Sequence, residues 1–361
     1  MLSRTPAVAL IAALTLTLAA CGGSDNESKS GGGGKIALLL PESKTTRYDQ
    51  QDKPNFIDKV RQLCSGCEVI YSNADQDVSK QQSQAEAALT AGAKVLVLDA
   101  VDVKAAAAIV RRAKQSNVPV ISYGRLVAGA PLDYYVSIDP FKVGQQQANS
   151  LVDKLGGKAG ARVIMINGSP TDSNSAPYKN GALSVFKKEG VKVVKSYDTP
   201  DWSPDKAQTE MDQAISSLGK NGFDAVYVAN DGMATGAIAA MKGARIDPAS
   251  KPVTGQDAEL AGVQRVLAGE QLMTVYQPIR KIAETAAELA VPLAKGSKPS
   301  AGLTPASVDN GAGKVPSALL DTIAITKDNV KSTVVKDGFL KKSDICRGRY
   351  QDACQSAGLG A

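Results

Sequence analysis

The chain has 361 residues, 43% of them hydrophobic, so it is long enough for two cores of ordinary domain size. Its net charge is only +6, and its basic residues are scattered rather than interleaved with aromatic ones, which argues against a nucleic-acid-binding surface. The sequence contains no histidine. Ser-His-Asp and Cys-His catalysis are therefore excluded, and the commonest transition-metal ligand is missing.

The first 20 residues predict a signal peptide. A short basic start containing Arg4 precedes an apolar stretch that is too short to span a bilayer comfortably. The stretch ends in Leu-Ala-Ala before Cys21, which resembles the lipobox of bacterial lipoproteins and implies cleavage before Cys21 and a lipid on this residue. Residues 21–34 are rich in glycine and serine and predict a flexible tether. The alternative is an ordinary signal peptide followed by a chance cysteine.

From residue 35 onward, short apolar runs alternate with longer amphipathic segments. The runs are nearly continuous in apolar residues, as expected for strands of a parallel sheet that is covered on both faces. This alternation predicts a doubly wound α/β fold. The expected strands are 35–40, 67–73, 94–100, 118–124, 133–139, 161–168, 191–198, 223–231, 251–257, 272–278 and a last one within 323–330, and the main helices are 79–92, 103–117, 205–222, 232–244 and 279–296.

The strands are too many for one ordinary sheet, so we expect two Rossmann-like lobes with a joint near residues 138–141. Several crossings of the chain between the lobes would form a hinge with a ligand cleft between them. The predicted first lobe comprises 35–139 and 278–310, the second lobe comprises 140–277 and 311–345, and 346–361 form a C-terminal tail.

Four cysteines lie beyond Cys21, and an even number in an exported protein suggests disulfides. The simplest of the three possible pairings joins Cys64 to Cys67 and Cys346 to Cys354. Cys64 and Cys67 could instead be a redox pair, but Cys64 falls at the end of a predicted helix rather than at the start, where a thiolate would be stabilised. Zinc binding is disfavoured because the spacing of Cys346 and Cys354 does not suit a ligand knuckle.

Ligands of open α/β sheets bind beyond the carboxyl ends of the strands, and polar or aromatic residues follow many of these ends. Such a mixture suits a neutral polyhydroxylated ligand, because planar polar groups bond hydroxyls and flat aromatic groups cover the CH faces of a sugar ring. Each candidate also has an ordinary structural alternative. Asn230 and Asp257 could cap a helix, Trp202 could lie in the core, and Arg47 could lie on an exposed loop. The candidate residues are Arg47, Tyr48, Arg125, Asn174, Trp202, Asn230, Asp257 and Gln277, with Asp172, Asp231 and Gln256 at the same strand ends.

These residues and several longer segments resemble the periplasmic sugar-binding proteins of ABC importers with the type I fold, and among them most closely the binders of D-xylose. The resemblance extends from residue 35 to about residue 345. The segments that carry it are DYYVSIDPFKVGQQQA (133–148), GSPTDSN (168–174), ANDGMATGAI (229–238), GQDAELAGVQRVLAGEQLMTVYQP (255–278) and VPSALLDTIAITKDNV (315–330).

The resemblance implies a role for each candidate. Arg47 belongs to the first binding loop, Tyr48 occupies the position of a tryptophan that stacks on the sugar, and Arg125 bonds to ring or hydroxyl oxygens. Trp202 is the opposing aromatic wall, and Gln277 lies at the hinge. The second-lobe contacts implied in addition are Asn174, Asn230 and Asp257.

Three positions depart from the family pattern: Gly124 stands where an aspartate usually precedes the arginine, Gln277 where xylose binders have lysine, and Tyr48 where they have tryptophan. The missing aspartate raises the question of what balances Arg125. Asp257 or another acid of the cleft, such as Asp75, could do so, or Gly124 could leave room for a larger sugar or a water molecule.

The resulting hypothesis is an extracytoplasmic, lipid-anchored receptor that captures a monosaccharide, such as a xylose-like pentose, and delivers it to an ABC permease. A separate ATPase is expected, because the chain has no GxxxxGK[ST] motif. We expect a monomer with no cofactor, no metal and no nucleic-acid partner. The main alternative is a sensor that presents its sugar to a signalling receptor. A sugar-responsive repressor would need an amino-terminal helix-turn-helix where the signal peptide lies, and an enzyme using Asp231 and Asp257 as a glycosidase pair is not expected.

Overall fold

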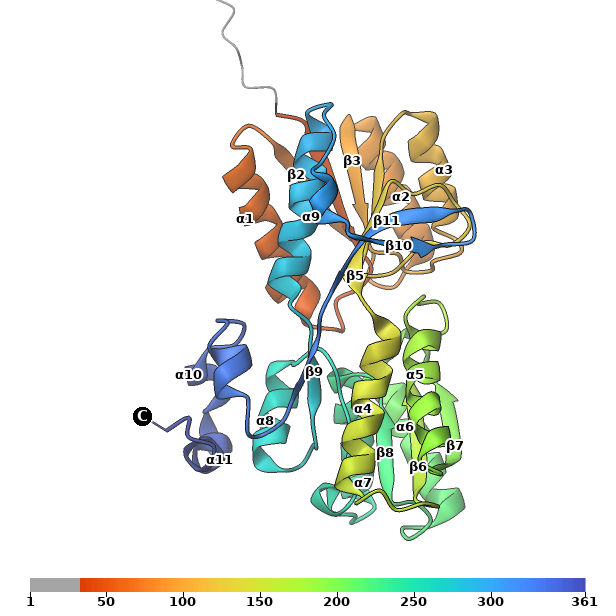
Figure 1. Cartoon of the computed structure of the whole chain (residues 1–361), viewed down its shortest axis with the longest axis vertical. Coiled ribbons are helices and arrows are strands. Elements are labelled where there is room, and N and C mark those ends of the chain that lie inside the picture. The colour runs from red at the N-terminus through yellow and green to blue at the C-terminus, as the bar shows by residue number, and fades with distance from the viewer. Residues whose placement is uncertain (1–32, 361) are drawn as a thin grey trace, which may run out of the picture. The chain divides into compact units, whose positions relative to one another are not determined.

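The computed structural model describes residues 33–360, which form two α/β lobes (Figure 1). The predicted signal peptide, Cys21 and nearly all of the tether lie outside these residues, so they stay predictions. None of the helices within the described range is long and apolar enough to cross a bilayer.

The first lobe is built on a seven-stranded sheet with the order β10-β11-β5-β4-β3-β1-β2. All neighbouring strands are parallel except β10, which pairs with β11 in the antiparallel direction. The strands are β1 (Lys35–Leu40), β2 (Glu68–Asn73), β3 (Ala93–Leu98), β4 (Val120–Tyr123), β5 (Tyr134–Ile138), β10 (Ala306–Asp309) and β11 (Lys314–Leu320). The helices of this lobe are α1 (Lys53–Leu63), α2 (Val78–Thr90), α3 (Ala107–Gln115) and α9 (Ile279–Ala294), with the short η1 (Tyr48–Asp52) and η4 (Ala301–Leu303).

Both faces of this sheet are buried, as the continuous apolar runs predict. Alternate residues of β1 belong to different hydrophobic clusters: Ile36 and Leu38 pack with α1 and α9, whereas Ala37 and Leu39 pack with α2 and α3. A strand that must be apolar on both sides shows no alternation with polar residues, which is why the sequence of β1 is KIALLL.

The second lobe contains a three-stranded parallel sheet with the order β7-β6-β8 and the antiparallel pair β9 and β12. The predicted strand 251–257 is reduced to a single bridge between Val253 and Val226. The strands are β6 (Arg162–Asn167), β7 (Lys192–Asp198), β8 (Ala225–Val228), β9 (Thr274–Tyr276) and β12 (Ile323–Ile325). The helices are α4 (Pro140–Lys154), α5 (Ser175–Lys188), α6 (Pro204–Leu218), α7 (Asp231–Gly243), α8 (Leu260–Ala268), α10 (Lys342–Ile345) and α11 (Gln351–Ser356), with the short η2 (Pro200–Trp202), η3 (Pro248–Ser250), η5 (Lys331–Val335) and η6 (Gly348–Tyr350).

The chain crosses between the lobes between β5 and α4, between β9 and α9, and between β11 and β12. The third crossing runs beside the other two, because Leu320 pairs with Ile138 and Ile323 pairs with Tyr276. Three adjacent connections restrict the relative motion of the lobes to a hinge.

The predicted assignment of residues 311–345 to the second lobe is wrong for β11. This strand lies in the first sheet, where it covers the edge of β5. The reason is that α9 and β10 both belong to the first lobe, so a tight hairpin returns β11 to the same sheet before the chain crosses at Asp321 and Thr322.

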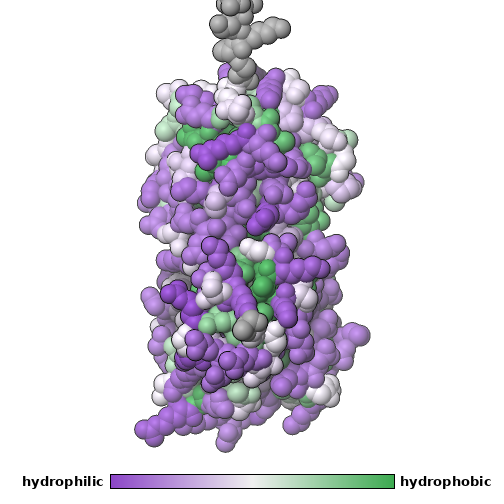
Figure 2. All heavy atoms as spheres, turned by 90° about the vertical axis from the view of Figure 1, so that its left-hand side faces the viewer, coloured by the Kyte–Doolittle hydropathy of each residue, from purple (hydrophilic) through white to green (hydrophobic). Residues whose placement is uncertain are grey.

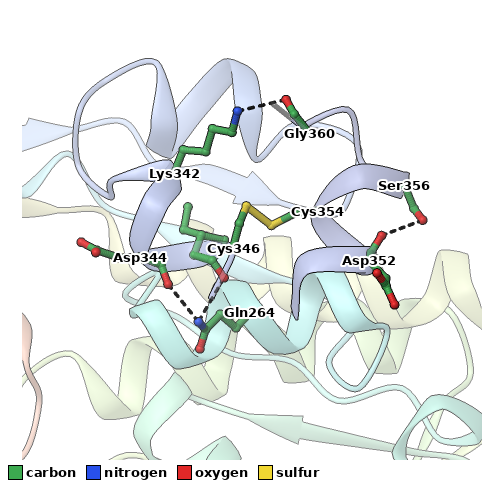
Figure 3. Close-up of a disulfide and its surroundings, with 9 residues drawn as sticks. Gln264, Lys342, Asp344, Cys346, Asp352, Cys354, Ser356 and Gly360 are labelled. Carbon is green, nitrogen blue, oxygen red and sulfur yellow. Dashed lines mark hydrogen bonds between the residues drawn. A yellow bond between two sulfur atoms is a disulfide. The ribbon is translucent and has the colours of Figure 1, made fainter. Parts of the chain in front are cut away.

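The C-terminal segment packs against α8 of the second lobe instead of extending as a free tail. The side chain of Gln264 on α8 donates to the backbone carbonyl oxygens of Asp344 and Ile345, both at 3.1 Å. Cys346 and Cys354 form a disulfide at this place, as Figure 3 shows. The second local pairing that we expected, Cys64 with Cys67, is also present, just after α1.

The face of the molecule that carries α1, α10 and α11 is mainly hydrophilic, and only small apolar areas interrupt it (Figure 2). On this face the disulfide-linked segment therefore presents polar groups to water while Cys354 and Ile345 are buried beneath them.

We predict that the double variant Cys346→Ser, Cys354→Ser loosens the C-terminal segment and leaves the two sheets intact. The disulfide closes a short loop, and its loss removes about 2 kcal/mol of local stability. Amide hydrogen exchange in residues 342–359 should then become roughly 30-fold faster. The variant Cys64→Ser, Cys67→Ser is the control and should leave exchange in this segment unchanged; equal exchange in all three proteins would contradict the prediction.

Candidate functional site

A cavity lies between the lobes, where the carboxyl ends of both sets of strands converge, and contains about 490 Å³ of space between atoms, including the part open to solvent. Side chains of both lobes line it, and all eight residues predicted for the ligand site are among them. The lining residues are Thr45, Arg47, Tyr48, Asp99, Gly124, Arg125, Ser137, Asp172, Asn174, Tyr178, Trp202, Asn230, Gln256, Asp257, Gln277 and Ile282.

Arg125 lies just after β4, separated from it by Gly124, and its guanidinium is buried between two carboxylates. Its Nε lies 2.8 Å from Oδ2 of Asp172 and 3.6 Å from Oδ1 of Asp99, and its Nη1 donates to the carbonyl oxygen of Ala100 at 2.8 Å. Asp99 comes from the end of β3 in the same lobe, whereas Asp172 comes from the loop after β6 in the other lobe. The buried charge is therefore balanced from both sides of the cavity.

An acid of the cleft balances Arg125, as one alternative allowed, but it is neither Asp257 nor Asp75, the two residues named for this role. Asp257 instead accepts a hydrogen bond from the amide of Gln277 at 2.8 Å. Asp75 is exposed and accepts one from Ser43, also at 2.8 Å. The partner of Arg125 depends on which loop the second lobe brings against β4, and the local sequence does not contain this information.

Arg47 links the first lobe to the hinge. Its Nε and Nη2 donate to Asp52 at 2.9 and 2.8 Å, and its Nη1 donates to the side-chain oxygen of Gln277 at 3.0 Å. Because Gln277 in turn donates to Asp257, one hydrogen-bonded chain runs from η1 through the second crossing to the loop before α8.

The two aromatic residues predicted as ligand walls lie in opposite lobes. Tyr48 is buried at the start of η1, with the guanidinium of Arg47 5.2 Å from its ring centroid. Trp202 is also buried; its indole Nε1 donates to Asp172 at 3.2 Å, and its ring meets Tyr178 edge-to-face with the centroids 6.4 Å apart.

Trp202 can occupy this position only because residue 168 is glycine. A Cβ atom at Gly168 would lie 2.0 Å from Cη2 and 2.3 Å from Cζ2 of the indole, far inside van der Waals contact. The backbone after β6 thus forms one side of the slot that holds the ring.

Asn230 has both of the roles that the sequence allowed. Its Oδ1 caps α7 by accepting from the backbone N–H of Met233 at 2.9 Å, and the residue also lines the cavity. Asp231 does not line the cavity, because its carboxylate accepts hydrogen bonds from Gln271 at 2.7 Å and Thr274 at 2.8 Å inside the second lobe. A glycosidase pair of Asp231 and Asp257 across a substrate is therefore not formed.

Several lining residues escaped the sequence prediction. Asp99 falls inside the expected strand 94–100, but β3 ends at Leu98, so the side chain of Asp99 lies beyond the strand. Tyr178 lies on the first turn of α5, a position that the strand-end criterion does not reach. Asp172 and Gln256 were recognised at strand ends but not selected, and Thr45 and Ser137 carry no distinct signal.

Hydrogen bonds close the cavity along its edges. The side-chain Nδ2 of Asn174, in the second lobe, donates to the backbone carbonyl oxygen of Gly124, in the first lobe, at 3.1 Å. On another edge, the backbone N–H of Thr46 donates to Oε1 of Glu259 at 3.1 Å. Together with the Arg125–Asp172 ion pair, these contacts define a closed arrangement of the lobes.

Three buried oxygen atoms of the lining residues have no hydrogen-bond partner within residues 33–360: both carboxylate oxygens of Asp99 and Oε1 of Gln256. Burial raises the pKa of Asp99 to about 8, against the opposing effect of Arg125 and Arg47, so its charged form is disfavoured in the closed cavity unless a ligand supplies donors that stabilise it. Burying an acceptor without a donor costs free energy, so a ligand that donates hydrogen bonds to these oxygens would be stabilised in the cavity.

The profile of the periplasmic binding protein domain matches residues 36–298, which is most of the chain. The chain belongs to the periplasmic binding protein family. The D-xylose-binding periplasmic protein of Escherichia coli (strain K12) is 36% identical over 315 residues, covering 86% of this chain and 92% of the relative. The multiple sugar-binding periplasmic receptor ChvE of Rhizobium radiobacter is 33% identical over 330 residues, covering 86% of this chain and 92% of the relative.

Solved structures agree with this assignment. An ABC transporter solute-binding protein from Clostridium phytofermentans with bound β-D-glucose superposes with a TM-score of 0.77 at 27% identity, covering 86% of this chain and 99% of that one. The Caulobacter myo-inositol-binding protein gives a TM-score of 0.73 at 26% identity, covering 85% and 97%. As a periplasmic binding protein, the chain is a receptor and not an enzyme.

We predict that Gly168→Ala displaces the indole of Trp202 toward solvent. Because Trp202 is the single tryptophan of the chain, the intrinsic fluorescence of the ligand-free protein should shift to longer wavelength. Overpacking of this kind also lowers the free energy of unfolding by roughly 1–3 kcal/mol.

Gly243→Ala at the end of α7 is the matched control, because nothing lies within 4 Å of a Cβ atom there. Its emission and stability should stay near those of the unsubstituted protein. Unchanged emission in Gly168→Ala would show that the slot is not the constraint on Trp202.

Proposed function

We propose that this chain is an extracytoplasmic receptor that captures a monosaccharide between its lobes and delivers it to an ABC permease. The observation that carries the proposal is the presence, in one cavity, of the guanidinium of Arg125 and the unpartnered buried oxygens of Asp99 and Gln256. Hydroxyl groups both donate and accept, so one polyhydroxylated ring can satisfy acceptors and guanidinium together.

Arg125 is the central polar contact of the proposed site, with Arg47, Asn174, Asn230 and Asp257 around it. Planar groups of these types fix hydroxyl positions by pairs of directed hydrogen bonds. Tyr48 and Trp202 supply flat apolar surfaces for the CH groups of the ring.

Capture follows from contacts that form only when the lobes meet. Arg125 and Asp99 belong to the first lobe, and Gln256, Asp257 and Trp202 belong to the second, so a ligand bonded to both sets stabilises the closed form selectively. This difference in affinity between the open and closed forms is what a ligand-driven hinge requires. The closed form then docks on the permease, whose ATPase is a separate chain.

The names of the relatives favour a pentose, hexose or cyclitol as the ligand, and D-xylose is the first sugar to test. The anchoring of the receptor to the membrane through a lipid on Cys21 is part of the same proposal. It rests on the sequence before and after Cys21, which resembles a lipoprotein signal followed by a tether.

Titration calorimetry with D-xylose, D-ribose, L-arabinose, D-glucose, D-galactose and myo-inositol tests the proposal. The protein is first unfolded in guanidinium, dialysed and refolded, so that any co-purified ligand is removed. One or more of these compounds should bind saturably with one site per chain and change the fluorescence of Trp202. Absence of binding across the whole panel would overturn the proposed function.

Arg125→Ala should weaken that binding by at least ~100-fold, because it removes a buried charged donor and leaves Asp99 and Asp172 unpaired. Arg162→Ala is the matched control: this arginine forms an ion pair with Asp224 at 2.9 Å away from the cavity. It should bind the same sugar as tightly as the unsubstituted protein, and a melting curve for each variant checks that it is folded.

A further inference from the structure

The carboxylate of Asp99 lies in the space that a side chain at residue 124 would fill. A Cβ atom at Gly124 would lie 2.4 Å from Oδ2 and 3.1 Å from Cγ of Asp99. Strands β3 and β4 are neighbours, with Leu98 paired to Ser122, so the two residues leave adjacent strand ends side by side. Any side chain at residue 124 would push the Asp99 carboxylate out of its present position.

The Asp99 carboxylate faces the cavity, and the ion pair beside it does not saturate it. Arg125 directs its Nε to Asp172 at 2.8 Å and its Nη1 to the carbonyl of Ala100, whereas the shortest ion-pair distance to Asp99 is 3.6 Å. Both oxygens of Asp99 are buried without a hydrogen bond in the part of the chain that the structure describes. Side chains that are buried and polar normally have partners, so this carboxylate is arranged for a donor that residues 33–360 do not supply.

We propose that Asp99 is the specificity-determining acceptor of the site, and that Gly124 is a glycine because it leaves room for this carboxylate. This inference rests on the proposed function and names its ligand class more closely. The two oxygens of Asp99 accept hydrogen bonds from two adjacent hydroxyl groups of a monosaccharide or cyclitol. The acid that the resemblance implies at residue 124 is thus supplied from the neighbouring strand.

Moving the carboxylate from residue 124 to Asp99, at the end of the neighbouring strand, changes which ligand hydroxyls the site can bind. A carboxylate that enters from β3 approaches the ligand from another direction than one on the residue before Arg125, while Arg125 itself keeps its place after β4. The pair of hydroxyls that satisfies both groups must therefore have the spacing and orientation set by Asp99. Binding sites built around a bonded hydroxyl reject analogues that lack it far more strongly than apolar pockets reject a missing methylene.

Asp99→Asn tests the acceptor role, because asparagine keeps the size of the side chain but replaces one acceptor oxygen with a donor. The best ligand of the panel should bind roughly 10- to 100-fold more weakly to this variant. The monodeoxy derivatives of the same ligand are then titrated against both proteins. A derivative that lacks a hydroxyl bonded to Asp99 should already bind weakly to the unsubstituted protein and lose little more in the variant.

This cycle separates a ligand contact from a merely supporting role. If Asp99 only holds Arg125 in place, Asp99→Asn weakens every deoxy derivative by the same factor as the parent sugar, and the proposal is overturned. It is also overturned if Asp99→Asn binds the parent as tightly as the unsubstituted protein. If the unsubstituted protein binds nothing in the panel, the proposed function fails, and this inference fails with it for that distinguishable reason.

A matched pair of glycines tests the space that Gly124 provides. Gly124 and Gly129 both have φ of +65°, but nothing lies within 4 Å of a Cβ atom at Gly129. Both alanine variants carry the backbone strain of a positive φ, so Gly129→Ala controls for that strain, and Gly124→Ala adds the overlap with Asp99. Only Gly124→Ala should displace Asp99 and reproduce the loss of affinity and the altered deoxy-sugar pattern of Asp99→Asn, whereas equal affinities for Gly124→Ala and Gly129→Ala would refute the shared-space argument.

Discussion

The buried guanidinium of Arg125 is the constraint on which the rest of the cavity depends. A permanently charged group that is removed from water must have carboxylates or strong acceptors around it, and here they come from two different lobes. Asp99 lies beside Arg125 within the first lobe, and Asp172 reaches it only when the second lobe is in contact. Charge balance at one residue is thereby coupled to the relative position of two domains.

The hinge transmits this coupling because its three connections are not independent. The β11–β12 connection pairs with the ends of β5 and β9, and the side chain of Gln146 on α4 bonds to Thr322 within it. Gln277, at the start of the second connection, bonds to both Arg47 and Asp257. A rotation of the lobes therefore changes the cavity and the hinge together, which concentrates the structural response to a ligand in a few hydrogen bonds.

The sequence was sufficient to predict the class of fold and the positions of the candidate residues, for one physical reason. In a parallel sheet all carboxyl ends lie at one edge, so residues far apart in the chain, such as Arg47 and Asn230, can be placed together without any knowledge of distances. Where the prediction failed, the missing information was non-local. The sheet that β11 joins depends on where a hairpin returns the chain, and the partner of Arg125 depends on how two lobes meet.

Asp99 shows a different limit of such predictions. It falls near the end of an expected strand, and its importance follows from the absence of a side chain at Gly124, just after the neighbouring strand β4. When an acid is lost at one strand end and present at the next, the site keeps the same kinds of side chain. Only the direction from which the acid reaches the ligand changes. A departure from a family motif is therefore better examined in three dimensions before it is taken as the loss of a contact.

The distribution of charge explains why a ligand with many hydrogen-bond donors fits the closed form. Within the first lobe each cavity arginine already has a carboxylate neighbour: Asp52 for Arg47 and Asp99 for Arg125. Closure then adds Asp172 and Asp257 from the second lobe, so the closed cavity gains acceptors without gaining a further cation among its lining residues. Asp172 and Asp257 have donors in the closed form. Both oxygens of Asp99 and Oε1 of Gln256 are instead buried without a donor from residues 33–360, a cost that hydroxyl groups of a ligand would remove. In the proposed mechanism the ligand therefore adds bonds that the inter-lobe contacts of the chain itself do not provide.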